Sequence, residues 1–286
     1  MEIHQQRPLG LKMKLLFSIL IGIFSYNSFA NEEIHANTDY SKIQKQHTTR
    51  ILQLKTTNEE LLKTHCKYES DIAEKPPIKK IALTLDDGPI PGHTEDILAV
   101  LKKHHAPATF FIVGQHAKAH PRLLDLILSD NNHLIGNHSW DHPNFHELNV
   151  PDQSLEITKT ESLLQEKSDK LFRYPFGNSS CEANQIVKSH NYRIVGWHVD
   201  SCDWAFSQNG EMNIADRALC GVTPENIDDY VGHVVSQIKK RDGGIVLFHE
   251  THRYSIMKLD ELLTKLEQEG YQFASILDKE FAPSLK

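Results

Sequence analysis

The stretch Ile81-Ala82-Leu83-Thr84-Leu85-Asp86-Asp87-Gly88-Pro89 decides the fold. It begins with a short, nearly continuous apolar run, which is typical of a strand buried on both faces. Asp, Gly and Pro then end the strand in a turn. Because side chains alternate along a strand, the two carboxylates can serve two purposes, one binding a metal and the other facing a substrate. Taken alone, the two acids are equally well explained as ordinary turn formers.

Short apolar strands alternate with amphipathic helices over the rest of the chain. We predict further strands over 108–113, 134–136, 171–176, 193–199 and 244–248, with a short one near Phe273. The helices predicted between them cover 95–104, 121–129, 151–167, 182–190, 224–240 and 256–269. This alternation indicates an α/β protein whose parallel strands are joined by helical crossovers.

Polar residues gather at or just beyond the carboxyl ends of these strands: Asp86, His138, Arg173, Asp200, Asp203 and His249. An open sheet tends to confine its site to one switch point, whereas a barrel builds its active site along the whole carboxyl-terminal face. About seven strand–helix units also suit a barrel. We therefore predict a barrel with its functional site at that face.

The first 30 residues have the makeup of an export signal. Lys12 and Lys14 precede an apolar run over 15–24, and Ser28-Phe29-Ala30 resembles a cleavage site. The run is shorter than the ~20 residues that a spanning helix needs, although an uncleaved anchor is the alternative. We expect an exported protein, periplasmic or secreted, that keeps no stable membrane span after the signal is cleaved.

The chain after the signal divides at Pro76-Pro77. Residues 31–78 form a polar extension with a helix predicted over 41–63, and residues 79–286 form the expected catalytic barrel. With 286 residues and 39% apolar composition, the chain can bury one large core. The net charge of −7 argues against nucleic acid as a partner and leaves the oligomeric state open.

The four cysteines, Cys66, Cys181, Cys202 and Cys220, lack the paired CxxC spacing of a zinc site. Export permits disulfides, and an even number of cysteines favours them. Four cysteines allow three pairings. Cys202 with Cys220 is the most local pair and would leave Cys66 with Cys181. We expect at least one bridge near the predicted active face.

Two histidines four residues apart, in His138-Ser139-Trp140-Asp141-His142, follow the paired acids. Asp and His are ordinary zinc ligands, and three protein ligands leave one position open for water or substrate. A second carboxylate beside such a site can act as a base. Each motif also has an explanation without function. His138 and His142 could be surface histidines, Arg173-Tyr174-Pro175-Phe176-Gly177 could be a surface arginine and an ordinary turn, and His249 could be a core histidine. Their joint occurrence in this order favours a metal-assisted hydrolase.

Together, the segments around Asp86, His138, Arg173, Asp203 and His249 resemble the polysaccharide deacetylase (NodB-homology) family, carbohydrate esterase family four. The resemblance covers roughly 79–274. It implies a distorted (β/α)7 barrel that removes acetyl groups from N-acetylated, or sometimes O-acetylated, sugars. It also implies a divalent metal, with zinc the first expectation and cobalt or nickel as substitutes.

The resemblance also assigns the metal and the base. By motif, Asp87, His138 and His142 match the metal ligands of the family. Asp86 matches the catalytic base, and Arg173 is similar to the arginine that orients this base. Contact between the arginine and the carboxylate would keep the base charged, as its role requires.

The remaining matches lie on the substrate side. His249 resembles the general acid, and Asp203 the carboxylate that tunes its pKa. Phe176 takes the place of the residue whose backbone N–H helps to hold the oxyanion. Trp204 matches an aromatic residue that lines the groove, and Leu247 the apolar wall of the acetyl pocket.

An exported enzyme of this kind meets the glycans of a cell envelope. Peptidoglycan is the substrate we expect first, with oligomers of N-acetylglucosamine, as in chitin, as the alternative. A non-catalytic glycan-binding protein on the same scaffold is the rival from another class. Binding alone needs no acid–base pair, so the intact set of residues argues against that rival.

Overall fold

The computed structural model describes residues 72, 74–206 and 210–286. The predicted export signal, the predicted helix over 41–63 and Cys66 lie outside these residues, so they stay predictions. Within the described part, no helix has both the length and the apolar character needed to cross a bilayer.

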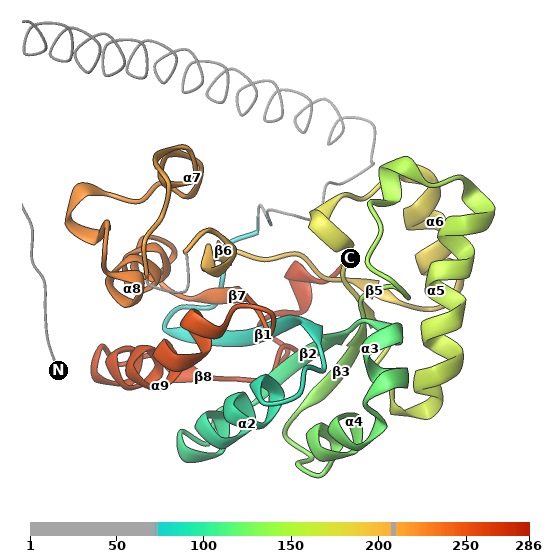
Figure 1. The fold of residues 1–286 in the computed structure, drawn as a ribbon, viewed down its shortest axis with the longest axis horizontal. Helices are drawn as coiled ribbons and strands as arrows, with labels where there is room; N and C mark the ends of the chain where they lie inside the picture. Colours follow the sequence, from blue (N-terminus) through green and yellow to red (C-terminus); the bar gives the residue numbers. More distant parts are fainter. Residues whose placement is uncertain (1–71, 73, 207–209) are drawn as a thin grey trace, which may run out of the picture. The chain divides into compact units, whose positions relative to one another are not determined.

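A single sheet of parallel strands forms the centre of the fold (Figure 1). The strands are β1 (Lys80–Gly88), β2 (Ala108–Ile112), β3 (Leu134–Asn137), β4 (Leu171–Phe172), β5 (Arg193–Ile194), β6 (Val199–Asp200), β7 (Gly244–His249) and β8 (Gln272–Phe273). Their order is β5-β4-β3-β2-β1-β7-β6, and β8 pairs with the first residues of β1. Since β5 and β6 are the two edges of this order, the barrel is open along one seam. The parallel α/β barrel expected from the sequence is confirmed.

Helices pack around the outside of the strands (Figure 1). They are α2 (His93–Lys103), α3 (Gly114–Ala119), α4 (Pro121–Leu128), α5 (Val150–Leu164), α6 (Cys181–Ser189), α7 (Ile214–Cys220), α8 (Tyr230–Arg241) and α9 (Arg253–Gln268). In α9 the buried residues Ile256, Leu259, Leu263 and Leu266 recur every three or four positions, as one face of a helix on a sheet requires.

The central strands are buried on both faces, which explains why their sequences are largely apolar rather than alternating. Every residue of β2 is buried, and so are residues 81–86 of β1. Strand β1 pairs with β2 on one side and with β7 on the other. In the second pairing Asp86 lies opposite His249, so two site residues are neighbours because of strand register alone.

The strand predicted over 193–199 is wrong. This segment forms two strands, β5 and β6, which lie at opposite edges of the sheet. The residues between them cross the open seam, where the guanidinium of Arg173 donates to the backbone carbonyls of Val195 (3.2 Å) and Gly196 (2.9 Å). Because these carbonyls bond to a side chain, the strand-to-strand ladder is interrupted there.

Helices α3 and α7 were not expected from the sequence pattern. Helix α7 lies in the insertion between β6 and α8, and its last residue, Cys220, forms a disulfide with Cys202. The most local of the three pairings is therefore the one present. The partner expected for Cys181, Cys66, lies outside the described residues.

The Cys202–Cys220 disulfide should stabilise the fold. It closes a loop with a sequence separation of 18, and loop-closure entropy predicts a contribution of about 3 kcal/mol to the free energy of unfolding. We expect the variant Cys202→Ser/Cys220→Ser to lose about that amount in denaturant unfolding under non-reducing conditions. Peptide mapping of the wild-type protein supplies the control, and free thiols at both positions would contradict the assignment.

Candidate active site

The carboxyl ends of the strands surround a hollow of about 440 Å³. Eight of the ten site residues expected from the sequence line it: Asp86, Asp87, His138, His142, Phe176, Trp204, Leu247 and His249. The other two, Arg173 and Asp203, lie directly behind this lining and are almost completely buried. All ten residues are therefore brought to one place, although they come from loops and strands spread over more than half of the chain.

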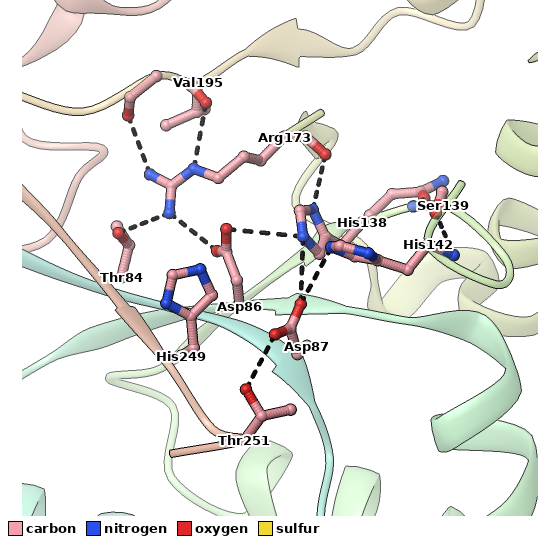
Figure 2. Close-up of polar contacts among 12 residues, drawn as sticks. Thr84, Asp86, Asp87, His138, Ser139, His142, Arg173, Val195, His249 and Thr251 are labelled. Atoms are coloured by element: carbon pink, nitrogen blue, oxygen red, sulfur yellow. Dashed lines mark hydrogen bonds and ion pairs between the residues drawn. The ribbon is translucent and has the colours of Figure 1, made fainter. Parts of the chain in front are cut away.

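Three potential metal ligands face one another in this hollow (Figure 2). Oδ1 of Asp87 lies 3.5 Å from Nε2 of His138 and 3.3 Å from Nε2 of His142. All three ligand atoms lie within 4.8 Å of one another. The backbone bends to achieve this, because Asp87 and His142 both have left-handed conformations, with φ of 73° and 63°.

The protonation of this cluster suits a cation. Nδ1 of His138 donates to the carbonyl of Arg173 at 2.8 Å, so Nε2 is left with a lone pair toward Asp87. Burial lowers the pKa of His142 to about 4, which keeps its ring neutral. Burial also works to raise the pKa of Asp87, yet His138 and the other nearby histidines hold it well below its ordinary value.

Oδ1 of Asp87 is a buried atom without a hydrogen-bond partner in the described part of the protein. A carboxylate oxygen left in that state is costly unless a cation neutralises it. One carboxylate and two neutral imidazoles are the donor set that suits zinc or a similar divalent ion. The residues present therefore fit the metal that the sequence resemblance implies.

Asp86 is held by Arg173. Nη1 of the arginine donates to Oδ1 of Asp86 at 2.9 Å and to Oγ1 of Thr84 at 2.7 Å. Its guanidinium also lies over the ring of Phe111, 4.3 Å from the ring centre. The second oxygen of Asp86 points toward the ligand cluster, 3.6 Å from Nε2 of His138. The carboxylate thus has one oxygen fixed by a cation and the other directed into the hollow (Figure 2).

His249 and Asp203 form a second pair, next to Asp86 on the neighbouring strand β7. Nδ1 of His249 lies 2.7 Å from Oδ1 of Asp203, and the backbone N–H of His249 donates to Oδ2 at the same distance. Burial works to lower the pKa of His249, but the charge and hydrogen bond of Asp203 outweigh it and raise the pKa to about 10. The ring is therefore a protonated imidazolium at neutral pH, in a position to donate a proton.

His252 also has a ligand atom within 4.8 Å of this pair. The close contact between His249 and Asp203 occupies Nδ1 and one carboxylate oxygen, as expected of a proton donor and its orienting acid. We therefore interpret only the cluster around Asp87 as a metal site.

Phe176 and Trp204 lie on the open side of the hollow, and Leu247 lies inside it. Phe176 is 62% exposed and lies edge-on to His142, with ring centres 4.7 Å apart. Its φ of 58° places the surrounding Pro175–Gly177 turn against the ligand cluster. Trp204 is partly exposed and donates from Nε1 to Oδ2 of Asp200 at 3.3 Å. Leu247, in contrast, is buried and forms the apolar floor.

Sequence reasoning missed three residues that support this site. Oγ1 of Thr251 donates to the outer oxygen of Asp87 at 3.2 Å, which leaves the other oxygen facing the histidines. Glu250 is completely buried under Gly88, where an added Cβ would come within 1.7 Å of its carboxyl group. Thr84 bonds to the guanidinium of Arg173. Thr84 could have been found from strand alternation, because it lies two residues before Asp86 and therefore on the same face.

Comparisons with known proteins agree with this arrangement. A family model described as polysaccharide deacetylase matches residues 73–195. The peptidoglycan-N-acetylglucosamine deacetylase PgdA of Listeria monocytogenes is 32% identical over 201 residues, covering 69% of this chain and 38% of that protein. The chain thus spans about four-tenths of the length of this relative.

Two further proteins are similar over most of their own length. The peptidoglycan-N-acetylmuramic acid deacetylase PdaA of Bacillus subtilis is 31% identical, covering 77% of this chain and 78% of that protein. The crystal structure of a CE4 family pseudoenzyme from Bacillus anthracis superposes with a TM-score of 0.57 at 25% identity, covering 72% of this chain and 66% of that one. These similarities establish that the chain belongs to the polysaccharide deacetylase family.

Proposed function

We propose that this protein is a metal-dependent N-deacetylase that hydrolyses the acetamide of N-acetylated sugars, most readily in peptidoglycan. One observation carries the proposal: a ligand cluster, a carboxylate fixed by an arginine and a histidine paired with Asp203 face the same hollow. A glycan-binding protein has no use for these three components together. Because a family relative is a pseudoenzyme, the proposal rests on the residues of this chain rather than on family membership.

Asp87, His138 and His142 would hold the metal, zinc first, with cobalt or nickel as substitutes. When bound there, a divalent ion polarises the acetyl carbonyl and makes a nearby water molecule more acidic. Thr251 and the carbonyl of Arg173 keep the ligand side chains in their orientations.

The remaining chemistry belongs to the side chains. Asp86 accepts a proton from the attacking water while the oxygen of that water bonds to the acetyl carbon. The backbone N–H of Phe176 supports the oxyanion that forms. When the C–N bond breaks, His249 gives its proton to the departing amine and acetate is left. Asp203 stabilises the imidazolium before that transfer.

The walls of the hollow suit a sugar. Leu247 offers an apolar surface to the acetyl methyl group, and the exposed face of Trp204 suits the apolar face of a pyranose ring. The predicted export signal and the peptidoglycan deacetylases among the relatives both support a cell-wall substrate, met in the periplasm or outside the cell. Oligomers of N-acetylglucosamine are the alternative substrate.

The first prediction concerns the reaction itself. The purified protein should release acetate from peptidoglycan, a chelator should abolish that release, and zinc should restore it. Asp86→Asn should lower the rate by ~10²–10⁴-fold, because the general base is lost. The measurement is acetate release, compared side by side on peptidoglycan, chitin oligomers and acetylated xylan. Wild-type rates in Asp86→Asn would refute the assignment, and activity confined to chitin oligomers or xylan would overturn the choice of substrate.

The second prediction concerns pH. The general acid must be protonated, so kcat/KM should fall as the pH rises through the pKa of His249. Asp203→Asn removes the charge that raises this pKa while burial continues to lower it. The alkaline limb of the kcat/KM profile should therefore move to lower pH by roughly 1–3 units. An alkaline limb that stays in place would show that His249 is not the acid.

The third prediction concerns Thr251. Thr251→Val keeps the size of the side chain but removes the hydrogen bond to Asp87, and we expect zinc affinity to fall by roughly 10–100-fold. Thr251→Ser, which keeps the hydroxyl, is the matched control and should bind zinc like the wild type. Competition against a chromophoric chelator measures both. Equal affinities in all three proteins would exclude an orienting role.

A further inference from the structure

A second hollow adjoins the first across Trp204, whose side chain lines both. Its volume is about 530 Å³, and its other lining residues come mainly from the insertion between β6 and α8. The charged residues that line it are Arg217, Glu211 and Asp228. A glycan whose sugar lies on Trp204 in the catalytic hollow would therefore present its neighbouring groups to this second hollow.

Arg217 is positioned for binding an anion. Its Nε donates to the carbonyl of Met212 at 2.9 Å, which fixes the guanidinium by one nitrogen. Met212 is itself 4% exposed and packs in the main core, so this anchor is firm. Among the described residues, Arg217 has no ion pair within 4.0 Å, and its two terminal nitrogens can accept a carboxylate as a fork.

The second hollow is also tied to the catalytic machinery. Helix α7, which carries Arg217, ends at Cys220, and the disulfide joins that residue to Cys202. Cys202 directly precedes Asp203 and Trp204 in the chain. The distance between the arginine and the catalytic pair is thus constrained covalently rather than by loop packing alone.

The charges select the kind of ligand. The guanidinium of Arg217 and the exposed carboxylate of Asp228 suit a group that carries both a carboxylate and an amine, whereas a polymer that carries only anions would be repelled by Asp228. Neutral chains such as chitin or xylan oligomers carry no charged group that could pair with Arg217 or Asp228. The peptide branches of peptidoglycan carry carboxylates, and those containing a diamino acid also carry an amine.

We propose that the hollow beyond Trp204 binds the peptide branch of peptidoglycan, with Arg217 pairing with a carboxylate of that branch. The proposal rests on the proposed function and specifies its substrate: a glycan strand that still carries its peptides. Asp228, an exposed acid of the hollow, faces the amine of the branch.

The test compares three substrates, of which the first two differ only in the peptide branch. They are glycan strands with a diamino-acid peptide branch, the same strands after an amidase has removed the branch and left the lactyl carboxylate, and N-acetylglucosamine oligomers. For Arg217→Gln we expect kcat/KM to fall by about tenfold on the first substrate, mainly through KM, relative to the other two. Arg122→Gln, an exposed arginine on α4, is the matched control and should leave all three ratios unchanged.

Binding gives a readout that does not depend on catalysis. In the Asp86→Asn background, calorimetry should show that Arg217→Gln weakens binding of the branched strands, and that acetylating the branch amine weakens their binding to Arg217-containing protein. An equal loss on branched and amidase-treated strands would show that Arg217 contacts the glycan that both share and would overturn the proposal, as would no loss on either. Absence of acetate release by the wild type from every substrate would refute the proposed function, while the binding comparison would still decide the role of Arg217.

Discussion

The buried guanidinium of Arg173 is the interaction on which the rest of the structure depends. A cation taken out of water costs several kcal/mol unless it is paired and its hydrogen bonds are satisfied. Here Asp86 supplies the charge, and Thr84 and the carbonyls of Val195 and Gly196 supply the remaining acceptors. Those carbonyls belong to the segment that crosses the seam of the barrel. The side chain of Arg173 therefore holds the segment that crosses the seam and also orients the proposed base. A substitution of Arg173 would affect both.

The backbone of Arg173 also positions the candidate metal ligands. The carbonyl of Arg173 accepts the hydrogen bond that fixes the ring of His138. Strand register then brings His249 opposite Asp86 on the next strand. The three components of the site are thus connected through main-chain geometry, which is more rigid than contact between loops. A reaction that needs water, acyl group and proton donor in one line depends on such rigidity.

Much of the fold and site could be predicted because burial leaves a strong pattern. Strands β1, β2 and β7 are largely apolar, and the polar residues at the ends of β1 and β7 indicate the site. The prediction of one strand over 193–199 was wrong because a strand of two residues has too short a sequence pattern to show where it ends. The interruption is also caused by Arg173, which is distant in the sequence. Helix α7 was not predicted because it has no buried residue and therefore no apolar face in its sequence pattern. Its apolar residues Ile214 and Leu219 are exposed. The role of Thr251 could not be predicted, because only the folded structure brings its hydroxyl next to Asp87, which is far away in the sequence.

Four residues of the active face, Asp87, His142, Phe176 and Cys202, have left-handed backbone conformations although none is glycine. Such conformations cost roughly 1–2 kcal/mol for most residues, and glycine adopts them freely. Selection for thermal stability alone would therefore favour glycine at these four positions and would remove two of the three proposed metal ligands and the Cys202–Cys220 disulfide in doing so. The side chains at these positions are therefore retained for what they do at the site, against the preference of the backbone that carries them.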